Sequence, residues 1–353
     1  MLRCPCRRPA AISNGRRHES KIEETGLRDI KFRAFELLTG LFAVVWLLNA
    51  AFQARAWLFA PDGAARANLL NAFANAEAKA PEWLQPVLAG VLHGVQAVGP
   101  TTVAVVMVII AAALGLSLLT RRALAVFAAF GFLYSLVCWV LLDALGFPYA
   151  HGQTDPGVFI PYAIAFLFVL SIRRPHGDSA YREVEVINPL WETSRLLFGL
   201  LWAFDAALKW LPAFMFHFSS QITSVIAGQP HWIADWLHFV ALVIDMAGPV
   251  LVAVIIALVE TAIALGLLSG RGLPLILPLG VLYSLAVWAT AEAFGGPYTA
   301  AGTGVRGNVI GNVIIYLIPF LFLSAELYAR NVRTRRVLRF GQGIAASHPA
   351  QPS

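Results

Sequence analysis

Charged residues are scarce in this sequence of 353 residues. They make up 13% of the chain, whereas an ordinary soluble domain has about 25%. Hydrophobic residues reach 58%, so a soluble protein of this length could not keep its surface polar. A disordered chain is excluded as well, because it needs low hydrophobicity and high charge. The composition therefore predicts a protein embedded in a membrane.

Cysteine is also rare. Cys4 and Cys6 lie in a basic N-terminal segment, and Cys138 lies in an apolar run. Three cysteines without a CxxC pair do not make a disulfide framework or a thiol–disulfide redox site. The HExxH, P-loop, dinucleotide-binding and Gly-x-Ser-x-Gly patterns are missing too. We therefore expect no metal site in this chain.

Long apolar runs, in contrast, are abundant. A transmembrane helix needs about 20 mainly apolar residues. We expect helices rather than barrel strands, because barrel strands alternate in hydrophobicity and these runs do not. The eight candidate spans are 35–57, 98–119, 123–145, 158–172, 191–211, 239–268, 273–293 and 309–328. The sixth of these contains Pro249, where we expect a kink or a start in the membrane interface.

Most of the 26 Lys and Arg residues fall on one side of this arrangement. They cluster before the first span, between the fourth and fifth spans, and after the eighth. Because basic loops stay in the cytoplasm, this pattern predicts a multi-pass protein of the bacterial inner membrane with both termini cytoplasmic. The net charge of +6 is thus a topology signal. We expect the lipid bilayer as a partner and no nucleic acid, because no folded basic surface is visible.

The two halves of the sequence resemble each other. Leu133-Tyr134-Ser135-Leu136 recurs as Leu282-Tyr283-Ser284-Leu285, at an offset of 149 residues. Gly99-Pro100 recurs as Gly248-Pro249 at the same offset. Four spans in each half return the chain to its starting side, so the repeats are expected to be parallel. The predicted fold class is an all-α integral membrane protein with eight transmembrane helices in two parallel-repeat four-helix bundles.

The boundaries of these parts follow from the apolar and basic segments. The outer excursions at 58–97 and 212–238 contain Trp residues, which suit amphipathic segments at the membrane interface. In chain order, we expect a basic cytoplasmic tail (1–33), a first four-helix unit (34–172), a cytoplasmic linker (173–190), a second four-helix unit (191–328) and a basic cytoplasmic tail (329–353).

Segments rich in Gly and Pro follow the third and seventh spans. Asp143 and Glu292 begin these segments at matching positions. Backbone groups freed there must bond to protein or water, so we expect each segment to re-enter the membrane or to line a cavity. Two interpretations of the carboxylates stay open: a proton or substrate site, or helix-end carboxylates that reach interfacial water. The other candidate catalytic and substrate-binding residues of these segments are Tyr149, Thr154, Asp155, Tyr298, Thr303, Arg306 and Asn308.

Charged residues also lie inside the fifth and sixth spans. Asp205 and Lys209 share one helix face and can pair. Glu260 lies well within the sixth span, where we expect it to be neutral or paired with a cation, and Lys209 is a candidate. The first half lacks evident counterparts of Lys209 and Glu260, so we expect a working catalytic site in the second half. The alternative is a structural ion pair that fixes the helix register.

Aromatic and histidine residues suggest two cofactors. His93 and His238 precede the second span of each half and could ligate a haem from facing helices. Their distances in sequence to the next Gly-Pro pair differ, however, so we do not expect haem. Flat rings inside the spans either line a quinone slot or simply pack. The candidate quinone-binding residues are Trp139, Trp288, Tyr134 and Tyr283.

These residues carry a resemblance to a known family. The segment 146–157, followed by Tyr162-Ala-Ile-Ala-Phe-Leu, resembles the DoxX/DoxD-like membrane family, which includes the DoxD-type subunit of thiosulfate:quinone oxidoreductase. In the second half, Arg195-Leu-Leu-Phe-Gly199 with Lys209 resembles the first helix of that family. Glu260 with Gly266-Leu-Leu-Ser-Gly-Arg271 resembles the second helix of that family and the turn into its third helix. The resemblance implies that each half is one four-helix DoxX-type unit.

The resemblance also implies a function. It points to an inner-membrane component of a quinone-linked oxidoreductase that oxidises a small sulfur anion, such as thiosulfate, at the outer face. Quinone would be the cofactor, Lys209 and Arg306 would attract the anion, and Asp143, Asp155 or Glu292 would take protons. A second membrane or periplasmic subunit is a candidate partner, because the chain has no redox motif. Two other functions stay open: a small-molecule transporter, and a non-catalytic membrane scaffold.

Overall fold

All regular structure in the described part of the chain is α-helix or 3-10 helix. The computed structural model describes residues 12–60, 64–146, 156–172, 189–295 and 311–346. Within these ranges there is no strand, so the prediction of an all-α protein is confirmed. The chain divides into two compact units, one of residues 1–37 with 324–353 and one of residues 38–323. The larger unit contains every candidate site residue that the structure describes.

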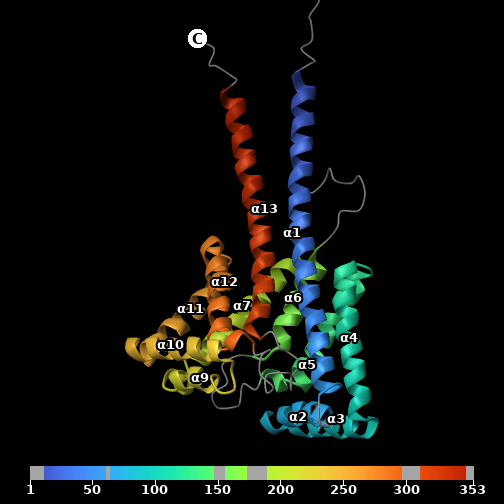
Figure 1. The fold of residues 1–353 in the computed structure, drawn as a ribbon. Helices are drawn as coiled ribbons and strands as arrows, with labels where there is room; N and C mark the ends of the chain where they lie inside the picture. The colour runs from blue at the N-terminus through green and yellow to red at the C-terminus, as the bar shows by residue number, and fades with distance from the viewer. Residues whose placement is uncertain (1–11, 61–63, 147–155, 173–188, 296–310, 347–353) are drawn as a thin grey trace, which may run out of the picture. The chain divides into compact units, whose positions relative to one another are not determined.

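Helices of the first half follow the predicted spans closely. Figure 1 shows α2 and α3 running across the end of α4. The turn from α3 into α4 is sharp because Gly99 adopts a φ of 101°, which favours glycine, and Pro100 then starts the next helix. The helices are α1 (Ile12–Trp57), α2 (Ala64–Lys79), α3 (Gln85–Val98), α4 (Pro100–Thr120), α5 (Leu124–Leu141), the 3-10 turn η2 (Ala144–Gly146) and α6 (Phe159–Ser171).

The second half has the same kinds of element in the same order, with a more divided outer excursion. The short helices α8 and α9 connect α7 to α10. The helices are α7 (Pro189–Lys209), α8 (Pro212–Met215), α9 (Phe218–Ser224), α10 (His231–Ala247), α11 (Pro249–Ser269), α12 (Leu273–Ala289), the 3-10 turn η4 (Ala293–Gly295) and α13 (Val313–Ala346).

The sixth predicted span differs from the structure. The sequence predicts one span over 239–268, but the helix ends at Ala247 and a new one begins at Pro249. Gly248 has a φ of 94°, which breaks the helix between them. The apolar run continues across the break because α10 is itself apolar. Hydropathy alone therefore made the span too long.

Among the residues that the structure describes, five helices are long and apolar enough to cross a membrane: 33–57, 100–120, 124–141, 249–269 and 313–331. The helices α6 and α12 are apolar but shorter, and α7 carries four charged residues in its 21 positions. Large apolar side chains on the candidate spans face outward, as Val126 and Leu265 do with 70% and 62% exposure. Such surfaces suit lipid, so the structure supports a membrane protein. The count of eight spans stays a prediction.

The two halves of the larger unit pack through α6. Nearly every residue of α6 is buried, since α5 and α7 both pack against it. Phe168 on α6 meets the ring of Trp191 on α7 edge to face at 4.9 Å. It also stacks on Phe322 of α13, with ring centroids 6.0 Å apart. These rings join the halves by apolar contact.

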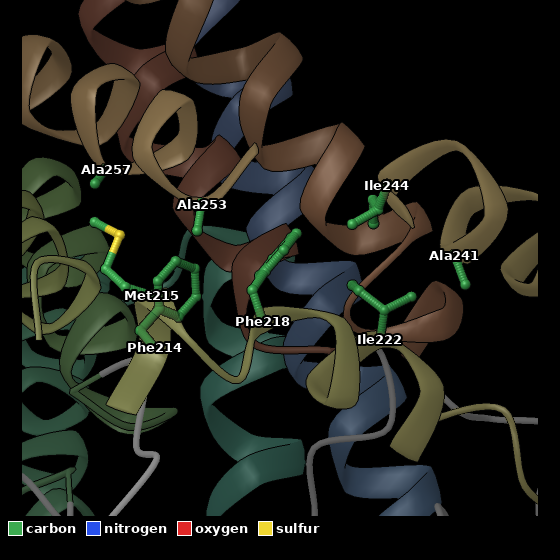
Figure 2. Close-up of a cluster of buried hydrophobic side chains, with 8 residues drawn as sticks. All are labelled: Phe214, Met215, Phe218, Ile222, Ala241, Ile244, Ala253 and Ala257. Atoms are coloured by element: carbon green, nitrogen blue, oxygen red, sulfur yellow. The ribbon is translucent and has the colours of Figure 1, made fainter. Parts of the chain in front are cut away.

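A hydrophobic cluster lies next to the C-terminal end of α7. Figure 2 shows side chains from four helices that meet there. Phe214 and Phe218 are the large members, with ring centroids 5.3 Å apart. The cluster holds α8 and α9 against α10 and α11, and it consists of Phe214, Met215, Phe218, Ile222, Ala241, Ile244, Ala253 and Ala257.

Candidate functional site

The antiparallel pair α7 and α11 sets the register of the buried charges. Near one end of the pair, the Arg195 guanidinium donates to the carbonyl oxygens of Leu267 and Leu268, the last turn of α11. Near the other end, the Trp210 indole donates to Thr261 Oγ1 at 3.0 Å. Between them Gly199 lets the helices approach, because a Cβ there would lie 2.9 Å from the Leu268 side chain. This register brings Lys209 opposite Glu260.

Lys209, Glu260 and Tyr283 form one buried contact group. Lys209 Nζ lies 3.5 Å from Glu260 Oε1, and the Tyr283 hydroxyl donates to the same oxygen at 2.5 Å. Glu260 is 4% exposed and Lys209 is 8% exposed. The pairing of Glu260 with Lys209 that the sequence suggested is thus confirmed. A buried carboxylate so partnered avoids the large cost of an isolated charge.

A second carboxylate lies one turn earlier on α7. Asp205 is 5% exposed, and its Oδ2 accepts a hydrogen bond of 2.9 Å from the Tyr316 hydroxyl of α13. The ring of Trp202 packs against both tyrosines, with centroids 5.8 Å from Tyr283 and 5.4 Å from Tyr316. Two carboxyl–tyrosine pairs and one ammonium are therefore held around one indole. Each carboxyl and each phenol is a group that can take or give a proton.

An aromatic ring covers this ionic group at the C-terminal end of α7. Lys209 Nζ lies 5.4 Å from the ring centroid of Phe214, which belongs to the cluster of Figure 2. A cation over a ring face gains electrostatic stabilisation. The low-polarity surroundings strengthen every interaction inside the group. The arrangement is a charged site shielded from bulk water.

Asp143 and Glu292 make a different kind of contact. Asp143 is fully buried, and its Oδ2 accepts from the backbone N–H groups of Val158 and Phe159, at 2.7 and 3.0 Å. These amides open α6 and have no partner within that helix. Glu292 Oε1 accepts in the same way from Asn312 and Val313 at the start of α13, at 2.8 and 3.1 Å.

The two carboxylates thus cap helix N-termini across a loop. The helix dipole and two amide donors favour their charged form. Asp143 is buried and Glu292 is half-buried, and each carboxylate bonds to backbone amides; both sequence-based interpretations of these residues stay predictions. A role as proton acceptors stays a prediction.

The four candidate quinone residues do not form a single contact group in the described contacts. Trp139 donates through Nε1 to the Pro156 carbonyl at 2.7 Å and so ties α5 to the segment before α6. Trp288 packs edge to face on Phe294, with centroids 5.2 Å apart. Tyr134 lies against Trp46 of α1, with centroids 6.2 Å apart. Only Tyr283 belongs to the ionic group.

The structure does not describe the remaining predicted substrate-binding and catalytic residues. Tyr149, Thr154, Asp155, Tyr298, Thr303, Arg306 and Asn308 lie outside the described residues. His93 on α3 and His238 on α10 are both exposed. In the part of the chain that is described, no three His, Cys, Asp or Glu side chains gather as metal ligands would.

Sequence analysis missed the first-half counterpart of the Asp205–Tyr316 pair. Asn49 on α1 donates from its amide to the Tyr162 hydroxyl on α6. The ring contacts around it match as well: Trp46 lies 5.0 Å from Tyr162, as Trp202 lies close to Tyr316. The sequence did contain a signal: Phe166-Leu-Phe168 of α6 recurs as Phe320-Leu-Phe322 of α13, and the same offset of 154 residues aligns Tyr162 with Tyr316. Nothing in the sequence gave the register of α1 against α6.

Comparison of the chain with protein-family models, with curated proteins and with solved structures found no match. The resemblance to the DoxX/DoxD-like family therefore stays a prediction from the residues that carry it. The assignment of a function rests on the geometry of the site.

Proposed function

We propose that this chain is an integral component of a quinone-linked oxidoreductase, and that its second half carries the working site. One observation carries the proposal: Glu260 Oε1 lies 2.5 Å from the Tyr283 hydroxyl and 3.5 Å from Lys209 Nζ, buried among apolar and aromatic side chains. A carboxyl that shares a proton with a phenol beside an ammonium is suited to proton transfer in a medium without water. Quinone chemistry in a membrane requires such transfer.

The chemistry balances as follows. A quinone takes two electrons and two protons to become a quinol. Two thiosulfate anions supply two electrons when a sulfur–sulfur bond forms between them and gives tetrathionate. In the proposal, Glu260 and Tyr283 pass protons to the quinone, and Lys209 stabilises the negative charge that forms on its oxygen. Electrons reach the quinone from the sulfur anion directly or through a second membrane or periplasmic subunit.

The proposal includes a topology. Eight spans form two parallel four-helix units in the bacterial inner membrane, with both termini and the linker in the cytoplasm. It draws support from contacts that recur in both halves, such as Asn49–Tyr162 and Asp205–Tyr316. The residues 147–155 and 296–310 then face outward, where Arg306 attracts a small anion.

Purified full-length chain tests the function directly. Decylubiquinone is supplied with thiosulfate or sulfite, with and without candidate partner subunits, and quinone reduction is followed by absorbance. We expect turnover in the unsubstituted chain and a loss of about 100-fold in Glu260→Gln, as for removal of a general acid–base group. Glu82→Gln changes an exposed carboxylate between α2 and α3 and serves as the control. No turnover under any of these conditions would remove the proposal.

A transporter is the second candidate, because two helices are discontinuous. The breaks at Gly99 and Gly248, with φ of 101° and 94°, occur at matching points before α4 and α11. Broken helices near buried charges are a feature of many transporters. Uptake into liposomes that depends on Glu260, without quinone reduction, would favour this candidate. If Glu260→Gln changes stability alone, the chain is a scaffold.

A further inference from the structure

A line of polar side chains runs along the buried face of α1. Trp46, Asn49, Gln53 and Trp57 are between 1% and 4% exposed. Their spacing of three, four and four residues places them on one side of the helix. This line belongs to the first half, away from the Lys209–Glu260 pair. Each of these four side chains carries a polar group, although α1 is apolar enough to be a candidate span.

One polar atom of each of these side chains has no hydrogen-bond partner among the described residues. They are Trp46 Nε1, Asn49 Oδ1, Gln53 Oε1 and Trp57 Nε1. The Asn49 amide already bonds to Tyr162 through its other end. Turning that amide over would exchange the bonded atom and still leave one atom free. Buried polar atoms in native proteins are nearly always bonded, so four on one helix face indicate an occupant.

The pattern of these atoms defines the occupant chemically. Indole N–H donors stand at the two ends of the line, and amide oxygens that accept stand between them. A hydroxyl group matches this pattern, because it accepts from an indole and donates to an amide oxygen. The matching positions in the second half hold Asp205 and Lys209, which are charged. The side chains of this line are uncharged at every position, so a neutral occupant fits.

We propose that Trp46, Asn49, Gln53 and Trp57 form a binding site for neutral hydroxyl groups. Two sources share this chemistry: a hydroquinone head group and a line of water molecules. The rings of Tyr134 and Tyr162 flank Trp46 at 6.2 and 5.0 Å and give the site flat apolar walls. A hydroquinone would connect this site to the proposed function, whereas water would serve as a neutral hydrogen-bonded path. The oxidised quinone lacks hydroxyl donors and fits less well.

Equilibrium binding to the purified full-length chain tests the hydroquinone. Decylubiquinol, kept reduced without oxygen, is titrated and its binding is measured by calorimetry, with decylubiquinone as the comparison. We expect decylubiquinol to bind at least about 10-fold more tightly than decylubiquinone. Asn49→Leu and Gln53→Met should each weaken decylubiquinol binding at least about 10-fold, because each removes one hydrogen bond to a buried polar group. Gln229→Met removes another amide with an unpartnered oxygen, far along the chain, and should leave binding unchanged.

Radiolytic hydroxyl labelling tests water, because water bound beside a buried side chain is the source of the radical. Labelling of Trp46 and Trp57, with buried Phe198 as the unlabelled reference, would support water. A loss of labelling at both tryptophans when decylubiquinol is added would support the hydroquinone. Binding requires no turnover, so a chain that binds decylubiquinol but reduces no quinone keeps this inference and loses the proposed function.

One result overturns the inference. If neither decylubiquinol binding nor labelling of the two indoles is seen, the site has no occupant, and Gln53→Met should then unfold at a higher temperature than the unsubstituted chain. Removing an unsatisfied buried polar group then stabilises the protein.

Discussion

Tyr283 and Tyr134 stand at matching positions of α12 and α5, yet their hydroxyls differ in hydrogen bonding. Tyr283 donates to the Glu260 carboxylate, whereas the Tyr134 hydroxyl has no hydrogen-bond partner among the described residues. A hydrogen bond to a charged group contributes about 1.5–3 kcal/mol. We therefore expect Tyr283→Phe to lower the free energy of unfolding by about that amount, and Tyr134→Phe by less than about 1 kcal/mol. Thermal unfolding in one detergent measures both.

The comparison of these two variants is informative because they remove the same atom from the same kind of site. Equal losses of stability would show that the carboxylate adds nothing to the bond of Tyr283. In that case Glu260 would interact mainly with Lys209, and the proton-sharing pair on which the proposed function rests would have no energetic support.

Only part of this site could be predicted from residues alone. Lys209 and Glu260 stood out because a charge inside an apolar helix must have a partner. Tyr316 and Asn49 did not, because a tyrosine or an amide in a buried helix looks like ordinary packing. Their role depends on the register between helices, which neither hydropathy nor spacing records. The partner of a residue on another helix is a tertiary property.

At the scale of the element, Asp143 decides how α6 begins. Its carboxylate satisfies two backbone amides that no residue of α6 can reach. We expect Asp143→Ala to destabilise the chain by about 1–3 kcal/mol for each buried amide left without a partner. Asp143→Asn keeps one oxygen as acceptor and should lose less. Thermal unfolding measured beside quinone reduction separates the roles: an Asn variant that is stable but inactive would contradict pure capping.

Most helix boundaries could be predicted from the sequence, and the exceptions have physical causes. The limits of α4 and α6 lie within two residues of their predicted spans, because apolar runs end where Gly, Pro or charge begins. Pro249 predicted the break next to Gly248, but hydropathy did not, because apolar residues continue on both sides of it. Hydropathy measures burial and not direction, so it cannot reveal where a helix turns into the membrane interface.

At the scale of the whole molecule, the side of the membrane on which the segments of the second half lie depends on whether α7 crosses it. Its four charged residues keep it out of the set of long apolar helices. Yet Asp205 and Lys209 are buried with their partners, so their charges need not face lipid. If α7 crosses the membrane, each half has four spans and the halves run parallel. If it does not, the second half is inverted relative to the first, and residues 296–310 lie on the side opposite to 147–155.

Cysteine labelling in intact cells distinguishes these two arrangements. In a chain whose three cysteines are replaced by serine, single cysteines are introduced by Ala150→Cys, Ala301→Cys, Ser179→Cys and Ser347→Cys. Because basic segments stay in the cytoplasm, we expect a membrane-impermeant maleimide to label the first two at once and the last two only after the membrane is opened. Labelling at 150 without labelling at 301 would mean that α7 does not cross. Glu260 lies near the middle of the candidate span 249–269, so Lys209 would then have to reach this depth from a helix that does not cross, and the proposed parallel arrangement of the two halves would be wrong.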